Sequence, residues 1–84
     1  MKITLKLFAS LADHLPSEAR ATHATDVRVQ PGVTVADVIR RQGIPEGACA
    51  LVLVDGIWLP PRERATRVLA DGETLAIWPP VAGG

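Results

Sequence analysis

Strict alternation of polar and apolar side chains at the start of the chain is the feature that most restricts its fold. In the segment Lys2–Leu7 the apolar residues are Ile3, Leu5 and Leu7, and the residues between them are polar. Successive side chains of an extended segment point to opposite sides, so a period of two predicts a β-strand with one buried face. The chain therefore begins with a half-buried strand.

Four further segments are expected to be strands. Residues 26–30 alternate and end at a Pro-Gly pair, and residues 74–78 alternate as well. Residues 51–54 are continuously apolar, which predicts a strand covered on both faces or close to it. The Asp55-Gly56 pair that follows favours a two-residue hairpin turn, which returns the chain through a strand at residues 57–59.

One segment, residues 34–42, carries the signals of a principal helix. Thr34 is a typical N-cap, Asp37 stands at the third helical position of a capping box, and Gly43 closes the helix. Only a short helix is expected over residues 8–15, because a proline follows and disfavours helical geometry at the residue before it. With one sheet and one principal helix, the chain is predicted to be an α+β domain.

Length and composition describe one small, electrically balanced domain spanning residues 1–84. Nine Lys and Arg residues balance nine Asp and Glu residues, so the Lys/Arg surplus that sequence-independent nucleic-acid binding needs is missing. The single cysteine, Cys49, cannot form an internal disulfide. With no secretory signal and no apolar run of about 18 residues, the chain is expected to be cytoplasmic and without a membrane partner.

The remaining polar residues do not form a catalytic or metal-binding pattern. His14 and His23 have no Cys or carboxylate partner at metal-ligand spacing, so both are expected to be solvated surface residues and no metal is expected. Cys49 adjoins an apolar segment and has no neighbouring His, which favours a small buried side chain. No carboxylate is paired with a general base. The chain is therefore not expected to be catalytic on its own.

One local basic cluster stands out in a charged, irregular stretch that covers residues 62–70. It consists of Arg62, Arg64 and Arg67. The cluster is interpreted either as a solvated loop or as a rim contact for an acidic partner. The sequence leaves both interpretations open.

The end of the chain differs in kind from the rest. Trp78 closes the last predicted strand, and two prolines then hold the backbone extended. The expected flexible tail, which lacks charge and bulk, consists of Pro79, Pro80, Val81, Ala82, Gly83 and Gly84. Because glycine lacks a Cβ atom, the last two residues would pass through a narrow channel into an active site that another protein supplies. An ordinary frayed terminus is the alternative.

Motifs along the whole chain resemble those of a known family. They are Leu7-Phe8-Ala9, Val54-Asp55-Gly56, Asp71-Gly72-Glu73 and Pro79-Pro80-Val81-Ala82-Gly83-Gly84. In this order they are similar to the MoaD/ThiS-type sulfur carriers, typified by the small subunit of molybdopterin synthase and by the thiamine sulfur carrier. The double proline after an aromatic residue resembles the molybdopterin branch. The resemblance implies a ubiquitin-like β-grasp fold, with a single mixed sheet of about five strands and one principal helix packed on one face.

The resemblance also implies that the terminal carboxylate is the reactive group. Gly84 would be adenylated by a ubiquitin-activating-like (E1-like) enzyme, which uses ATP and Mg, and would then be converted to a thiocarboxylate. The sulfur would be delivered, together with the large subunit of molybdopterin synthase, to a precursor of the molybdenum cofactor. No cofactor is expected on this chain itself.

Individual residues receive roles from the same resemblance. Gly83 would permit close approach, and the inserted tail would consist of Pro79, Pro80, Val81 and Ala82. Trp78 and Phe8, with the exposed apolar part of the last strands, would form the partner-docking surface. Two departures from the family are Asp55, where relatives often have Asn, and the basic stretch at residues 62–67, which leaves the identity of the docking partner open.

Other functions fit the same sequence. Related carriers serve thiamine, other thio-metabolites and tRNA thiolation, and a ubiquitin-like modifier would use the same activation to join Gly84 to a lysine. A plain β-grasp interaction module with an inert tail is a third possibility. The sequence does not distinguish between the sulfur acceptors or indicate the oligomeric state of the free chain.

Overall fold

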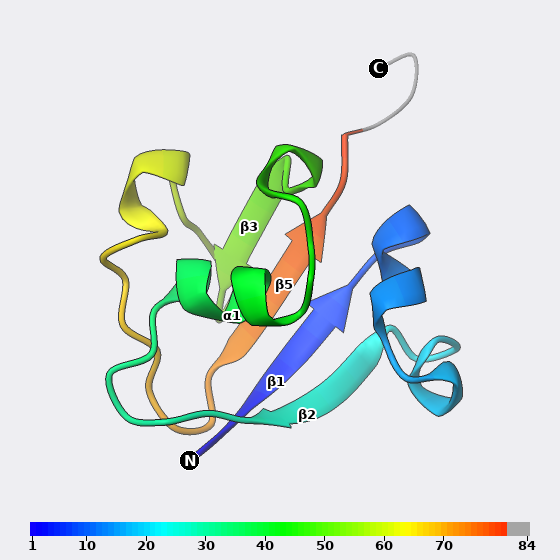
Figure 1. Cartoon of the computed structure of the whole chain (residues 1–84), viewed down its shortest axis with the longest axis horizontal. Helices are drawn as coiled ribbons and strands as arrows, with labels where there is room; N and C mark the ends of the chain where they lie inside the picture. The colour runs from blue at the N-terminus through cyan, green and yellow to red at the C-terminus, as the bar shows by residue number, and fades with distance from the viewer. Residues whose placement is uncertain (81–84) are drawn as a thin grey trace.

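The computed structural model describes residues 1–80, which form a five-stranded mixed sheet with one α-helix packed on one face (Figure 1). The strands are β1 (Lys2–Leu7), β2 (Ala24–Arg28), β3 (Leu51–Val54), β4 (Ile57–Trp58) and β5 (Thr74–Trp78). Their order across the sheet is β2-β1-β5-β3-β4. The neighbouring strands β1 and β5 run parallel, and every other neighbouring pair is antiparallel. The predicted α+β class and β-grasp arrangement are confirmed.

The α-helix, α1 (Val35–Arg41), begins and ends where the sequence predicts. The Thr34 hydroxyl accepts a hydrogen bond from the Asp37 N–H at 3.1 Å, and the Asp37 carboxylate accepts one from the Thr34 N–H at 3.0 Å. This reciprocal pair satisfies two N–H groups that a helix start leaves free. At the other end Gly43 has a φ of +74°, which lets the N–H of Ile44 reach back to the Ile39 carbonyl at 3.2 Å.

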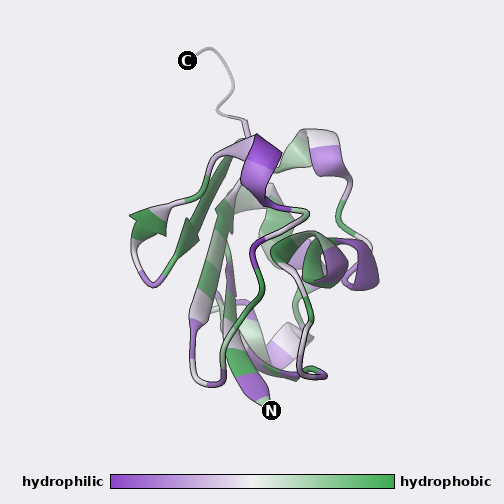
Figure 2. Ribbon diagram, turned by 90° about the vertical axis from the view of Figure 1, so that its left-hand side faces the viewer, coloured by the Kyte–Doolittle hydropathy of each residue, from purple (hydrophilic) through white to green (hydrophobic). Residues whose placement is uncertain are grey.

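The core lies between α1 and one face of the sheet, which we call the inner face. Figure 2 shows α1 on this side, with apolar segments of helix and sheet facing each other. The most deeply buried large side chains are Ile3, Leu5, Leu7, Val35, Val38, Val52, Leu75 and Ile77. They include every apolar residue of β1, one residue of β3 and the alternate apolar residues of β5 that face α1, so the period of two predicted in the sequence is confirmed.

Short 3₁₀ turns connect these elements. They are η1 (Ala9–His14), η2 (Ser17–Ala19), η3 (Glu46–Ala48) and η4 (Pro61–Glu63). The short helix expected over residues 8–15 is therefore a 3₁₀ segment, which starts after an extended Phe8 and a left-handed Ala9. The stretch after residue 62, expected to be irregular, also pairs with the start of α1 through a bridge between Thr34 and Val68.

Two strand predictions shift at their ends. Residues 26–30 were expected to form a strand, but β2 begins at Ala24, because the register with β1 joins Lys6 to Ala24 and Lys2 to Arg28. The hairpin strand ends one residue earlier than expected, at Trp58, although the Leu59 N–H still bonds to the Val52 carbonyl at 2.9 Å. Long-range register, which the local pattern does not contain, sets both boundaries.

One prediction about the core is wrong. The continuously apolar β3 is buried on its inner face only, and Leu51 on the other face is 38% exposed.

Of the tail, Pro79 and Pro80 are described, whereas residues 81–84 lie outside the described residues. Within residues 1–80 there is no helix with the length and hydropathy that a membrane crossing requires.

Candidate functional site

An apolar strip crosses the outer face of the sheet, the face opposite α1. It consists of Leu51, Leu53, Trp58, Ala76 and Trp78, which we call the outer strip. The register places Leu51 opposite Trp78, and it places Leu53 between Ala76 and Trp58. Side chains opposite each other on one face of a sheet are in contact range, so the strip is continuous across three strands. Trp58 is 57% exposed, more than any other residue of the strip.

Phe8 extends this surface at the end of β5. Its ring stacks on Trp78 with centroids 4.3 Å apart and an interplanar angle of 5°. On its other side it stacks on His23, with centroids 5.4 Å apart. The Phe8 N–H donates to the Ile77 carbonyl at 3.2 Å, which fixes the ring beside the strand. The two aromatic residues named from the sequence as docking residues thus lie together.

His23 differs from its prediction. It is half-buried rather than solvated, and its Nδ1 lies 3.2 Å from the Leu7 carbonyl oxygen. Its φ of +60° is in the left-handed region, which a backbone hydrogen bond from the Leu7 N–H to the His23 carbonyl helps to hold. His23 therefore supports the aromatic stack, a role that its sequence context does not indicate. His14, in contrast, is exposed as expected.

The tail leaves the sheet beside the outer strip. The Trp78 carbonyl accepts a hydrogen bond from the Ala50 N–H at 2.9 Å, which is the last backbone bond of β5. Pro79 and Pro80 have no N–H to donate, so strand pairing cannot continue through them. Pro79 is half-buried and Pro80 is exposed. The predicted tail residues Val81, Ala82, Gly83 and Gly84 lie outside the described residues.

The other half of the outer face is polar. Lys2 and Asp26 form an exposed ion pair with an N–O distance of 3.6 Å between β1 and β2. The Thr4 hydroxyl donates to the same carboxylate at 3.4 Å. Contacts of this kind between exposed groups stabilise the fold little and keep the surface hydrated. The apolar character of the outer face is therefore confined to the side from which the tail emerges.

The basic cluster does not behave as one unit. Arg62 is exposed, whereas Arg67 makes two hydrogen bonds to the Glu73 carboxylate, at 2.7 and 3.2 Å. The bonds from Arg67, with one from the Ala70 N–H, hold the pKa of Glu73 below its ordinary value. Arg64 is only 5% exposed, so the expectation of a solvated loop or rim contact is wrong for this residue.

The part of the chain that the structure describes contains no group of three or more His, Cys, Asp or Glu residues arranged to hold a metal ion. Cys49 is a buried free thiol whose Sγ lies 3.7 Å from the Pro45 carbonyl oxygen. Burial raises the pKa of Cys49, and the nearby Arg64 guanidinium offsets only part of that rise. The thiol is therefore a small buried side chain, as the sequence predicts.

Comparisons with known proteins agree with this geometry. Residues 1–83 match the family described as Mut7-C ubiquitin. No curated protein matches the sequence. The fold is similar to that of the HVO 2177 protein of Haloferax volcanii, at 27% identity and a TM-score of 0.74, covering 100% of this chain and 87% of that one.

Two further solved structures share the fold. SAMP1 of Haloferax volcanii is 24% identical, with a TM-score of 0.68 and full coverage of both chains. A complex of subunits 1 and 2 of the molybdopterin-converting factor from Helicobacter pylori contains a chain that is 16% identical, with a TM-score of 0.60 and full coverage of both chains. The family match and the shared fold confirm the ubiquitin-like resemblance that the sequence motifs indicate.

Proposed function

Because this chain belongs to the Mut7-C ubiquitin family, we propose that it is a ubiquitin-like sulfur carrier whose Gly84 carboxylate is the reactive group. The observation that carries the proposal is the position of the outer strip. An accessible apolar surface lies at the point where β5 ends and the tail begins. A partner that docks on this surface would receive the tail directly.

The proposed chemistry needs no catalytic residue on this chain. A carboxylate oxygen of Gly84 attacks the α-phosphorus of ATP, and pyrophosphate leaves. Sulfide (HS⁻) from the sulfur source then attacks the acyl carbon of the adenylate, AMP leaves as the C–O bond breaks, and loss of the sulfide proton gives a thiocarboxylate. The E1-like activating enzyme would supply the ATP and Mg sites. Gly83, which lacks a Cβ atom, would allow the carboxylate to enter a narrow channel.

The outer strip would be the docking surface for both the activating enzyme and the sulfur acceptor. Trp58 is its most exposed aromatic residue, and large aromatic residues dominate the binding energy of many interfaces. Leu51 and the Trp78–Phe8 stack would complete the contact toward the tail. Trp58 belongs to this surface because its register places it opposite Leu53. Trp58 was not predicted from the sequence to be a docking residue.

For the sulfur acceptor we propose the large subunit of molybdopterin synthase, so that sulfur would enter a precursor of the molybdenum cofactor. Support comes from the double proline at Pro79-Pro80 and from the shared fold with a subunit of the molybdopterin-converting factor complex. The large subunit would contact the outer strip and enclose the tail. Carriage of sulfur to thiamine, another thio-metabolite or tRNA would use the same residues of this chain.

Intact-mass measurement of the protein isolated with its activating enzyme, ATP and a sulfur source tests the proposal. The intact mass of the protein before it meets the enzyme checks that Gly84 is the terminal residue of the mature protein. We expect one oxygen-for-sulfur exchange, which is lost on deletion of Gly84 and retained in Lys2→Gln, a control on the polar half of the outer face. Persistence of the exchange after deletion of Gly84 would show that the Gly84 carboxylate is not the required site.

A second candidate is a protein modifier, because the chain shares its fold with the small archaeal modifier protein 1 of Haloferax volcanii. The first step would be the same, and the acyl carbon of Gly84 would then be attacked by a lysine amine. Cells that express a tagged chain would contain Gly84-dependent adducts of higher mass. Recovery of the free chain and its thiocarboxylate alone would favour the sulfur carrier.

A further inference from the structure

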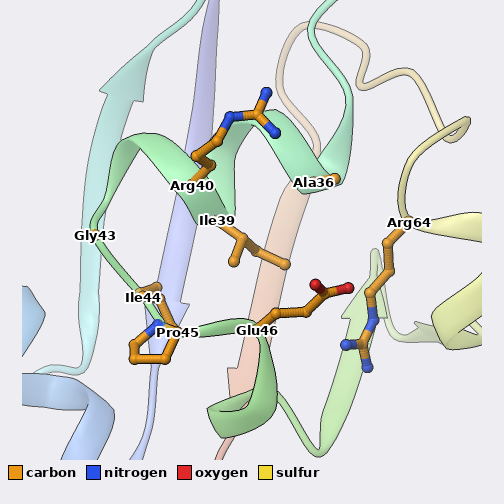
Figure 3. A pocket seen from close by; sticks show the side chains of 8 residues that line it. All are labelled: Ala36, Ile39, Arg40, Gly43, Ile44, Pro45, Glu46 and Arg64. Atoms are coloured by element: carbon orange, nitrogen blue, oxygen red, sulfur yellow. The ribbon is translucent and has the colours of Figure 1, made fainter.

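A pocket of about 410 Å³ lies on the helix side of the molecule, away from the outer strip (Figure 3). The end of α1, the segment after it and η3 supply most of its wall, and Arg64, which follows η4, closes one side. Its apolar wall is formed by Ala36, Ile39, Ile44 and Pro45. The volume is in the range of pockets that hold small molecules and is well above that of one side chain.

Arg64 is held at this pocket by its backbone. Its carbonyl accepts a hydrogen bond from the Ala36 N–H at 2.9 Å, and its N–H donates to the Pro61 carbonyl at 3.3 Å. The first bond ties η4 to the first turn of α1, where N–H groups need acceptors from outside the helix. The side chain is thereby carried into the wall of the pocket, and the residue is 95% buried.

The guanidinium of Arg64 has an unused binding edge. Nε and Nη2 are both out of contact with water, and neither has a hydrogen-bond partner among the described residues. These two nitrogens form the side of the guanidinium that grips a carboxylate with two parallel hydrogen bonds. Because this edge makes no hydrogen bond where it lies, rotation of the side chain toward a ligand in the pocket gives none up.

Among the described residues that line the pocket, Arg64 is the cation without a charged partner. Arg40 also lines the pocket, but it is exposed and its guanidinium is paired with Asp37. Figure 3 shows the Glu46 carboxylate extending from the opposite wall toward Arg64, yet the two groups do not come within the 4.0 Å of a salt bridge. Glu46 is exposed, so it is a competitor for Arg64 and not a partner that neutralises it.

We propose that this pocket binds a small organic carboxylate, with its carboxylate on Arg64 and its apolar body against Ile39, Ile44 and Pro45. A buried arginine without a partner is costly to a fold, and a bound anion offsets that cost while the apolar wall excludes water from the pair. The pocket and the outer strip lie on different sides of the sheet, so this site does not depend on the proposed sulfur chemistry.

Titration of the full chain with sodium isovalerate, followed through backbone amide resonances in NMR spectra at neutral pH, tests the proposal. We expect saturable shifts at Ala36, Gly43 and Glu46, and none with isovaleramide, which has the same shape without the charge. Arg64→Gln should weaken binding by at least about tenfold. Arg62→Gln, an exposed arginine two positions away, should leave it unchanged.

Glu46→Gln sharpens the test. Removal of the competing carboxylate should tighten isovalerate binding a few-fold, by about the energy of an exposed ion pair. Saturable shifts that are the same in wild type and Arg64→Gln, or no saturable shifts in either wild type or Glu46→Gln, would overturn the proposal. An acetylated glutamate amide that binds more tightly than isovalerate would overturn it too, because the occupant would then be a protein side chain.

Thermal unfolding separates a binding role of Arg64 from a structural one. Arg64→Met keeps the length of the stem and removes the unpaired charge, so its Tm without ligand should equal or exceed that of the wild type. Isovalerate should raise the Tm of the wild type and not that of Arg64→Met. A fall in Tm of more than about 4 °C on this substitution would mean that Arg64 serves the fold, against the proposal.

Discussion

The inner and outer faces of the sheet carry similar side chains with different consequences. On the inner face Val52 and Leu75 have no exposed surface and pack in the core with α1. On the outer face Leu53 and Trp78, each next in sequence to a core residue, retain contact with solvent. Apolar character alone therefore does not indicate burial. Changes on the inner face should alter stability, and changes on the outer strip should alter docking.

The largest expected effect is on the inner face. Leu75→Ala should lower the free energy of unfolding by about 2–5 kcal/mol, because it removes a fully buried side chain and leaves a cavity. Leu53→Ala, the same change on the outer strip, should cost less, since that side chain is only half-buried. Urea unfolding of both variants measures the difference. Equal losses would contradict the division between the two faces.

The next effect is on docking. Trp58→Ala should lower the efficiency of Gly84 adenylation at least about tenfold, as expected for an aromatic interface anchor, while the free energy of unfolding changes by about 1 kcal/mol or less. Pyrophosphate exchange with the activating enzyme measures the first quantity, and urea unfolding the second. Thr4→Ala, on the polar half of the same face, is the matched control and should leave adenylation unchanged.

A smaller effect concerns the helix that covers the inner face. Thr34→Ala removes the N-cap of α1 and should lower the free energy of unfolding by about 1 kcal/mol. Thr34→Ser keeps the hydroxyl and should retain most of that stability. Both variants should be adenylated as fast as wild type, because the cap lies on the side of the sheet away from the outer strip. Slower adenylation of either variant would show that docking also depends on α1.

The smallest expected effect is a pH dependence. The Arg67 hydrogen bonds lower the pKa of Glu73 in the folded state, so their stabilisation is present above the ordinary pKa of 4.5 and is lost as the pH falls through the folded value. Glu73→Gln should cost about 1 kcal/mol or less near neutral pH and nothing at the lowest pH. Urea midpoints across this range, compared with those of the exposed control Glu18→Gln, test the sign.

Local patterns were sufficient for most of the fold. The period of two in β1, the caps of α1 and the turn at Asp55-Gly56 each depend on neighbours in sequence, and all three predictions are confirmed. The prediction for the apolar run of β3 was wrong. A strand that is buried on both faces has the same local pattern as a strand with one buried face and one exposed apolar face. Only the register of β3 with its neighbours separates the two.

In the candidate sites, too, contacts between residues far apart in sequence could not be predicted from local patterns. Phe8 and Trp78 were named from the sequence through family resemblance, whereas their stacking depends on the pairing of β1 with β5. Arg64 lies in a charged stretch that follows two prolines and is typical of a solvated loop. Its burial follows from backbone contacts between η4 and α1, which join residues far apart in sequence. The only local signal for Arg64 is its place in the basic cluster. The structure shows that the other two arginines of that cluster are more exposed than Arg64.

The place of β5 in the sheet has a mechanical consequence. This strand leads to the tail and is bonded on both sides, in parallel to β1 from Thr74 to Ile77 and antiparallel to β3. A pull beyond Trp78, directed away from the start of β1, loads the bonds between these two strands in shear, so they resist together and do not open one after another. Traction on the tail is therefore borne by a strand that is hydrogen-bonded to a neighbour on each side.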